Sequence, residues 1–202
     1  MGCPCALHLE SDAATAKRAL EVTREECDRL DRKYSHYRDD SLIAEIADRA
    51  GGDAIAVDEE TANLLDFAAE LHRQSGGRFD ITAGPLTRLW DLQSGRVPNT
   101  DEIEAARART GWDRVEWQRL NLRLPIAGMR LDLGGIVKEY AADRCAQLCR
   151  ESGVQHGVVD LGGDLALIGA HTGGQPWQIG IKAPRAPGAT ARVPPCQNAF
   201  RR

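Results

Sequence analysis

Two long amphipathic stretches, one near each end of the chain, limit the fold most. The first starts after Ser11 and Asp12, which can cap a helix, and ends near Ser35. Its apolar stripe repeats at steps of three, four and seven residues and contains Ala16, Leu20, Cys27, Leu30 and Tyr34. The second ends before Gly153, and its stripe contains Val137, Ala141, Cys145 and Leu148. Both patterns predict helices with one buried face.

Between and around these helices the pattern changes repeatedly between strand and helix. Further helices are expected over residues 42–46, 59–74 and 100–110, the last capped by Thr100. Alternating segments predict strands at residues 5–9, 115–117, 120–124, 129–133, 177–184 and, joined by a turn at 162–164, within 156–170. Because strands and helices do not alternate regularly, we expect an α+β fold: a mostly antiparallel sheet packed with the two long helices.

The charge balance and the apolar runs exclude several classes of protein. The formal net charge is −4, which does not suit a nucleic-acid-binding surface. No apolar run approaches the roughly 20 residues of a membrane span, and the N-terminus shows no signal peptide. The chain as given is therefore expected to be cytoplasmic; a periplasmic or membrane-anchored location would require a signal or lipobox upstream.

The six cysteines do not follow the spacing of a known metal or redox motif. One C-x-C and one C-x-x-x-C occur, without the paired C-x-x-C of zinc sites. Cys145 and Cys149 lie one helical turn apart, so we expect them to pack as small apolar residues.

Asp132 stands just before Gly134 and Gly135, where a strand-like segment runs into the second long helix. A glycine pair at a helix start can admit an anionic ligand to unpaired N–H groups. The alternative is a tight turn with an acidic residue placed favourably near the helix N-terminus. From this motif alone the turn is the more frequent explanation.

Two other polar motifs allow the same two interpretations. Asp80 and Thr82, followed by Gly84, form either a fixed polar patch beside an aromatic side chain or a turn that caps its own backbone. Asp160 and Asp164 are either cation ligands or turn residues. The five histidines are scattered and form no triad, and His72 is expected on a helix surface. No catalytic residue is assigned.

Taken in order, the motifs resemble those of the ApbE family of FAD:protein FMN transferases. They are MG-x-P at the start, S-x-Y-x-x-D-S at 35–41, GGRFDITAGPLTRLW at 76–90, LDLGGIVKEYAAD at 131–143 and VVDLGGDLALIG at 158–169. The resemblance implies an ApbE-like flavin transferase domain over residues 1–184. The resemblance also implies that this domain is incomplete, because family members continue for a further C-terminal third that carries most of the metal ligands. Residues 185–202, which contain proline and arginine, are expected to form a flexible tail.

The resemblance also implies an enzyme activity. Such an enzyme uses Mg²⁺ to transfer FMN from FAD to a Thr or Ser hydroxyl of a flavoprotein acceptor, releasing AMP. The implied partners are FAD and that acceptor, with no nucleic acid and no membrane span. The alternative is a catalytically inactive FAD-binding protein or a fragmentary family member.

The site residues implied by the resemblance fall into two sets. The FAD-binding positions are Met1, Tyr37, Arg78, Phe79, Asp80, Asp132 and Lys138. Gly135 matches a position that helps to hold the metal. This chain departs from the family pattern at Ala47, where an asparagine is common, and at Glu139, where a glycine is frequent.

Overall fold

The structure is a computed structural model that describes residues 2–90, 95–182 and 190–191. Two compact units are distinguished, residues 28–138 (unit 1) and residues 2–27 with 139–202 (unit 2). The prediction of a single domain over residues 1–184 stays a prediction. Met1 and almost all of the predicted tail lie outside the described residues.

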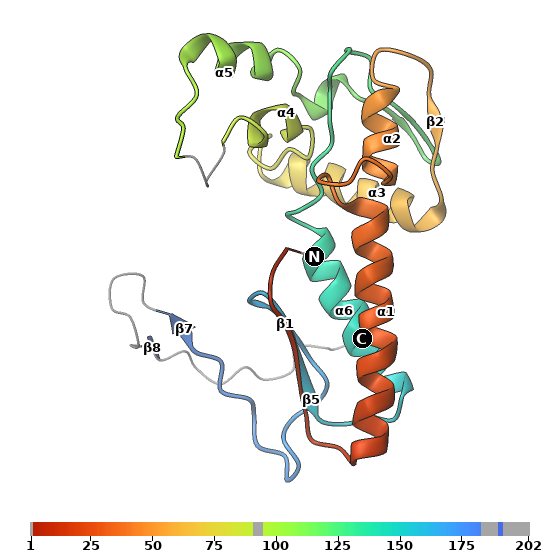
Figure 1. Ribbon diagram of the computed structural model, residues 1–202, viewed down its shortest axis with the longest axis vertical. Coiled ribbons are helices and arrows are strands. Elements are labelled where there is room, and N and C mark those ends of the chain that lie inside the picture. Colours follow the sequence, from red (N-terminus) through yellow and green to blue (C-terminus); the bar gives the residue numbers. More distant parts are fainter. Residues whose placement is uncertain (1, 91–94, 183–189, 192–202) are drawn as a thin grey trace. The chain divides into compact units, whose positions relative to one another are not determined.

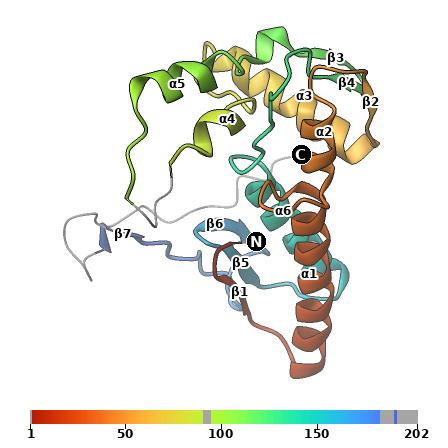
Figure 2. The same ribbon diagram turned by 45° about the horizontal axis from the view of Figure 1, so that its top comes forward.

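Unit 1 contains most of the helices and a small antiparallel sheet (Figure 1). Its elements are the end of α1 (Ala13–Tyr34), α2 (Leu42–Asp48), β2 (Ile55–Ala56), α3 (Glu59–Gln74), α4 (Gly84–Thr87), α5 (Thr100–Arg107), a 3₁₀ turn (Trp112–Arg114), β3 (Glu116–Gln118) and β4 (Asn121–Arg123). The strand order is β2-β4-β3, with Leu122 opposite both Ile55 and Trp117. Figure 2 shows this sheet beside α3, and the indole N–H of Trp117 donates to Asp66 on α3 at 2.7 Å.

Helix α3 has the bounds that its periodicity predicts, because both ends carry clear signals. The Asp58 carboxylate accepts from the Thr61 N–H at 2.9 Å, which caps the first turn. Glu59 and Glu60 in the first turn and His72 and Arg73 in the last match the helix dipole. Glu60 also receives hydrogen bonds from Arg29 and Lys33 on α1. The end of α1 is thereby joined to the start of α3.

Unit 2 contains an antiparallel sheet and the two long helices (Figure 1). Its elements are β1 (Cys5–Leu9), most of α1, most of α6 (Val137–Glu151), β5 (Gly157–Leu161), β6 (Asp164–Leu167), β7 (Ile181–Lys182) and β8 (Thr190–Ala191). The strand order is β1-β5-β6, and Val159 on the central strand lies opposite Leu7 and Ala166. Strands β7 and β8 pair with each other. The predicted α+β class with antiparallel pairing is confirmed.

The buried face of α1 differs from the predicted stripe. Leu20 is 56% exposed, whereas Thr15, Ala19 and Thr23 are buried. The Thr23 hydroxyl donates to the Ala19 carbonyl at 2.7 Å, so its polar group is satisfied inside the helix. Small side chains at four-residue steps therefore line the inner face. No helix in the described part of the chain has the length and apolar character needed to cross a membrane.

One predicted strand segment and one predicted cap are wrong, and a second predicted strand is confirmed only in part. Residues 129–133 form no strand; their backbone makes a single parallel bridge between Arg130 and Ala83. Of residues 177–184, only Ile181–Lys182 is a strand among the described positions. Asn99, not Thr100, caps α5, because its side chain accepts from the Glu102 N–H while the Glu102 carboxylate accepts from the Asn99 N–H.

The buried cysteines pack as expected. Cys145 and Cys149 are fully buried on α6, and the Cys145 sulfur lies 3.6 Å from the Cys27 sulfur on α1. The hydrogen bond with Cys27, followed by burial, raises the pKa of Cys145. Burial raises the pKa of Cys149 to about 11. These thiols stay protonated near neutral pH, which suits a packing role.

Gly169 and Gly163 provide a test of close packing in unit 2. Both have positive φ, but a Cβ on Gly169 would overlap the Gln155 carbonyl oxygen, whereas Gly163 faces open space. Both alanine variants carry the backbone strain, and only Gly169→Ala adds the overlap. Overpacking costs about 1–3 kcal/mol. We expect the melting temperature of Gly169→Ala to fall below that of Gly163→Ala by about 2–12 °C. Equal melting temperatures would contradict this packing.

Candidate functional site

A pocket of about 300 Å³ in unit 1 gathers several of the predicted site residues. It is lined by His36, Phe79, Asp80, Ile81, Ala83, Thr87, Asp132, Gly134 and Gly135. Its volume is at the lower end of the range for small-molecule sites, about 300–1,000 Å³. Four predicted positions, Phe79, Asp80, Asp132 and Gly135, therefore meet in one cavity although they come from two separate segments.

Two backbone segments lie against each other to form this pocket. The Asp132 N–H donates to the Ile81 carbonyl at 2.7 Å, and Arg130 bridges Ala83. A Cβ on Gly84 would lie 2.8 Å from the Arg130 carbonyl oxygen, so only glycine permits this approach. The glycine of the G-P pair is explained by close contact, not by an unusual dihedral angle.

Asp80 lines the pocket and fixes the backbone beside it through hydrogen bonds. One carboxylate oxygen accepts from the Thr82 N–H at 2.7 Å and from the Thr82 hydroxyl at 2.6 Å. The other accepts from the Trp112 N–H at 3.0 Å, and the buried Thr82 hydroxyl oxygen accepts from the Gly111 N–H at 2.7 Å. The capping turn expected as one alternative is confirmed, and its carboxylate also ties residues 80–82 to residues 111–112.

Asp132 forms a turn with the glycine pair and also faces a histidine. Its Oδ1 accepts from the Gly134 N–H at 2.9 Å. The same oxygen lies 3.3 Å from Nδ1 of His36, and the Asp132 side chain is 16% exposed. Asp132 therefore both caps the turn before the helix and lines the pocket. Sequence reasoning missed His36, because nothing in its local sequence separates it from the other scattered histidines.

The ring of Phe79 lies beside Gly135. A Cβ on Gly135 would be 3.1 Å from the Phe79 ring, so the glycine leaves room for the aromatic side chain. The Phe79 backbone is fixed from α3: its carbonyl accepts from Nδ1 of His72 at 2.9 Å, and its N–H donates to Ser75. The prediction that His72 is a surface residue is wrong, since its side chain is only 13% exposed.

Three predicted FAD-binding residues do not line this pocket. Tyr37 is 85% exposed, Arg78 is exposed with its guanidinium donating to the Ser75 carbonyl, and Lys138 lies half-buried in the first turn of α6. Met1 lies outside the described residues. For these four residues a role in binding FAD stays a prediction.

The described residues do not assemble a metal site from acidic, histidine or cysteine side chains. No group of three such residues within residues 2–90 and 95–182 could hold an ion. For Asp160 and Asp164, the sequence allowed either a cation site or a turn. The Asp160 carboxylate accepts from the Gly163 N–H at 2.8 Å, which agrees with the turn. Glycine could contribute only a backbone oxygen, which the search for acidic, histidine and cysteine side chains does not test. The metal position at Gly135 therefore stays a prediction.

The chain is similar to known proteins of the ApbE family. The ApbE family model matches residues 1–200. An FAD:protein FMN transferase from Salmonella typhimurium is 32% identical over 84% of this chain and 51% of that protein. Solved structures of the flavin transferase ApbE from Vibrio cholerae (25% identity, 96% of this chain, 64% of that one) and of the ApbE protein from Thermotoga maritima (32%, 92%, 62%) both have a TM-score of 0.82. The chain spans about half the length of the curated relatives it matches.

Replacing Asp80 tests the hydrogen bonds beside the pocket. Each carboxylate oxygen of Asp80 accepts at least one hydrogen bond from an N–H or O–H group. In Asp80→Asn, the amide nitrogen would replace one of these oxygens and place its N–H groups against a donor. We expect a loss of about 1–3 kcal/mol in the free energy of unfolding, measured by urea denaturation. Asp53→Asn, at an exposed residue of the loop before β2, is the control and should change it by less than about 0.5 kcal/mol. Similar losses in both variants would contradict the role of Asp80.

Proposed function

Because the chain belongs to the ApbE family, we propose that it transfers FMN from FAD to a Thr or Ser hydroxyl of a flavoprotein acceptor, in a Mg²⁺-dependent reaction that releases AMP. The observation that carries the proposal is the pocket in which Asp132, the Gly134–Gly135 pair and the ring of Phe79 meet. Since the chain spans about half of its curated relatives, the activity of the whole protein is part of the proposal.

The pocket offers complementary surfaces to a flavin nucleotide. The Phe79 ring supplies a flat apolar wall, and the absence of a side chain at Gly135 lets a ligand approach the backbone. The Asp132 carboxylate can accept hydrogen bonds from ribityl, ribose or base donors. Because it is already positioned by the Gly134 N–H, little further ordering is needed on binding.

The proposed reaction exchanges the phosphoanhydride bond of FAD for a phosphoester bond to the acceptor. The acceptor hydroxyl oxygen bonds to the phosphorus of the FMN half, the bond from that phosphorus to the bridging oxygen breaks, and AMP leaves with the electron pair. The hydroxyl proton is lost to solvent. The protein residues named above bind and orient the nucleotide, which is the main task of the protein in phosphoryl transfer.

The proposal requires few protein ligands for Mg²⁺. Mg²⁺ is commonly held by one or two protein oxygens together with substrate phosphates and water. The backbone oxygen of Gly135 is the one protein ligand proposed. When bound, the ion would neutralise charge on the diphosphate. A second candidate function, FAD binding without transfer, is favoured by the lack of a cluster of metal-binding side chains in the described residues.

The first test is a titration with FAD in the presence and absence of Mg²⁺, followed by flavin fluorescence. Asp132→Asn keeps an oxygen to accept from Gly134 but removes the charge. A lost charged hydrogen bond corresponds to an affinity about tenfold or more lower. Asp53→Asn, which removes a charge from an exposed loop residue, should bind as tightly as the native chain. Equal affinity of the two variants would remove Asp132 from the site.

A transfer assay then separates the two candidate functions. The chain is incubated with FAD, Mg²⁺ and an acceptor flavoprotein, and covalent flavin is detected by fluorescence after denaturing electrophoresis. A Thr→Ala acceptor is the control. Label that appears only on the Thr acceptor supports transfer. Tight FAD binding without any label supports the binding protein instead.

A further inference from the structure

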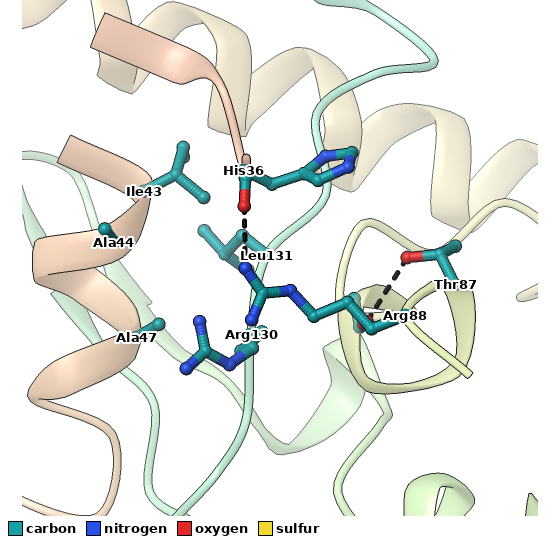
Figure 3. Close-up of a pocket in the computed structure, with 9 residues that line it drawn as sticks. His36, Ile43, Ala44, Ala47, Thr87, Arg88, Arg130 and Leu131 are labelled. Atoms are coloured by element: carbon teal, nitrogen blue, oxygen red, sulfur yellow. Dashed lines mark hydrogen bonds between the residues drawn. The ribbon is translucent and has the colours of Figure 1, made fainter. Parts of the chain in front are cut away.

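A second, smaller hollow adjoins the pocket within unit 1 (Figure 3). It has room for about one water-sized group, roughly 10 Å³, and shares His36 and Thr87 with the larger pocket. Its lining residues are His36, Ile43, Ala44, Ala47, Gly84, Thr87, Arg88, Arg130 and Leu131. None of the nine is acidic, and two carry guanidinium groups.

The two arginines reach this hollow from the same pair of segments that forms the pocket. Arg88 follows α4, and its Nη2 donates to the His36 carbonyl at 2.7 Å, which holds the guanidinium in place. Arg130 lies where its backbone bridges Ala83 and passes against Gly84. Figure 3 shows its guanidinium pointing toward Ala47 on α2.

Neither guanidinium is neutralised by a carboxylate of the described residues. In the described part of the chain no Asp or Glu forms an ion pair with Arg88 or Arg130, although other arginines of the same unit, such as Arg38, Arg49 and Arg123, each pair with a carboxylate. Two cations that share a partly enclosed hollow repel each other, and an anion between them would remove that repulsion. The planar guanidinium fork matches the oxygens of a phosphate group.

We propose that Arg88 and Arg130 form a phosphate subsite that takes one phosphate group of a nucleotide whose remainder occupies the adjoining pocket. The hollow has room for about one oxygen atom of that group and for no ring, so the rest of the phosphate lies toward the larger pocket. The nucleotide part of this inference rests on the proposed function. The binding of the phosphate itself does not, since it depends only on the two guanidinium groups.

Inorganic phosphate and pyrophosphate are the first probes, titrated by calorimetry into the native chain. Arg130→Gln is the informative variant, because the Arg130 side chain makes no hydrogen bond with the described residues and its loss should not disturb the fold. Arg49→Gln removes the same charge from an exposed residue of α2 that pairs with Glu45. We expect Arg130→Gln to weaken binding about tenfold or more, and Arg49→Gln to weaken it less than about twofold. Absence of binding to the native chain, or equal affinity in the two variants, would overturn the subsite.

Riboflavin, FMN and ADP then show which phosphate the subsite takes. Riboflavin carries no phosphate, so its affinity should be the same in Arg130→Gln and Arg49→Gln. Weaker binding of FMN alone to Arg130→Gln assigns the flavin-side phosphate, and weaker binding of ADP alone assigns the adenine side. If Arg130→Gln matches Arg49→Gln for both nucleotides, the nucleotide assignment is wrong.

The two proposals can fail separately. Phosphate binding that depends on Arg130, without any binding of flavin, would contradict the proposed FMN transfer and support the phosphate subsite. If FAD binding and transfer are the same in Arg130→Gln and Arg49→Gln, FMN transfer is supported and the subsite is contradicted.

Discussion

The pocket of unit 1 depends on the close approach of two backbone segments, residues 81–84 and 130–132. The Asp132 N–H bonds to the Ile81 carbonyl, and Gly84 leaves the space that the Arg130 backbone fills. Every group discussed as a ligand contact lies on these segments or beside them. The carboxylate of Asp132, the Phe79 ring and the Arg88 guanidinium are thus positioned by main-chain contacts, which vary less than side-chain rotamers.

Regular local patterns predicted the helices and the hairpin well. Helix α3 has both a side-chain cap and charges matched to its dipole, and the β5–β6 hairpin has turn glycines between alternating apolar residues. The pattern failed where neighbours decide. Residues 129–133 alternate like a strand but find only one bridging partner, and Leu20 is exposed because threonine and alanine occupy the inner face of α1.

The candidate site was predictable only in part. Asp80, Asp132 and the glycine pair lie in short motifs whose turn chemistry is legible in sequence. Their FAD and metal roles came from the family resemblance, not from the residues. His36, Arg88 and Arg130 gave no signal, because each belongs to a different segment and becomes notable only beside the others. Spacing along the chain cannot reveal a hollow that tertiary contacts create.

The hydrogen bond from the Gly111 N–H to the Thr82 hydroxyl has a consequence for motion. It joins two residues 29 positions apart and is supported by the bond from the Trp112 N–H to Asp80. The segment between them, which carries α4 and α5, is therefore a closed loop whose ends separate only when both bonds break. Hydrogen exchange at these two amides accordingly reports local unfolding of the pocket, and it can be measured without a ligand.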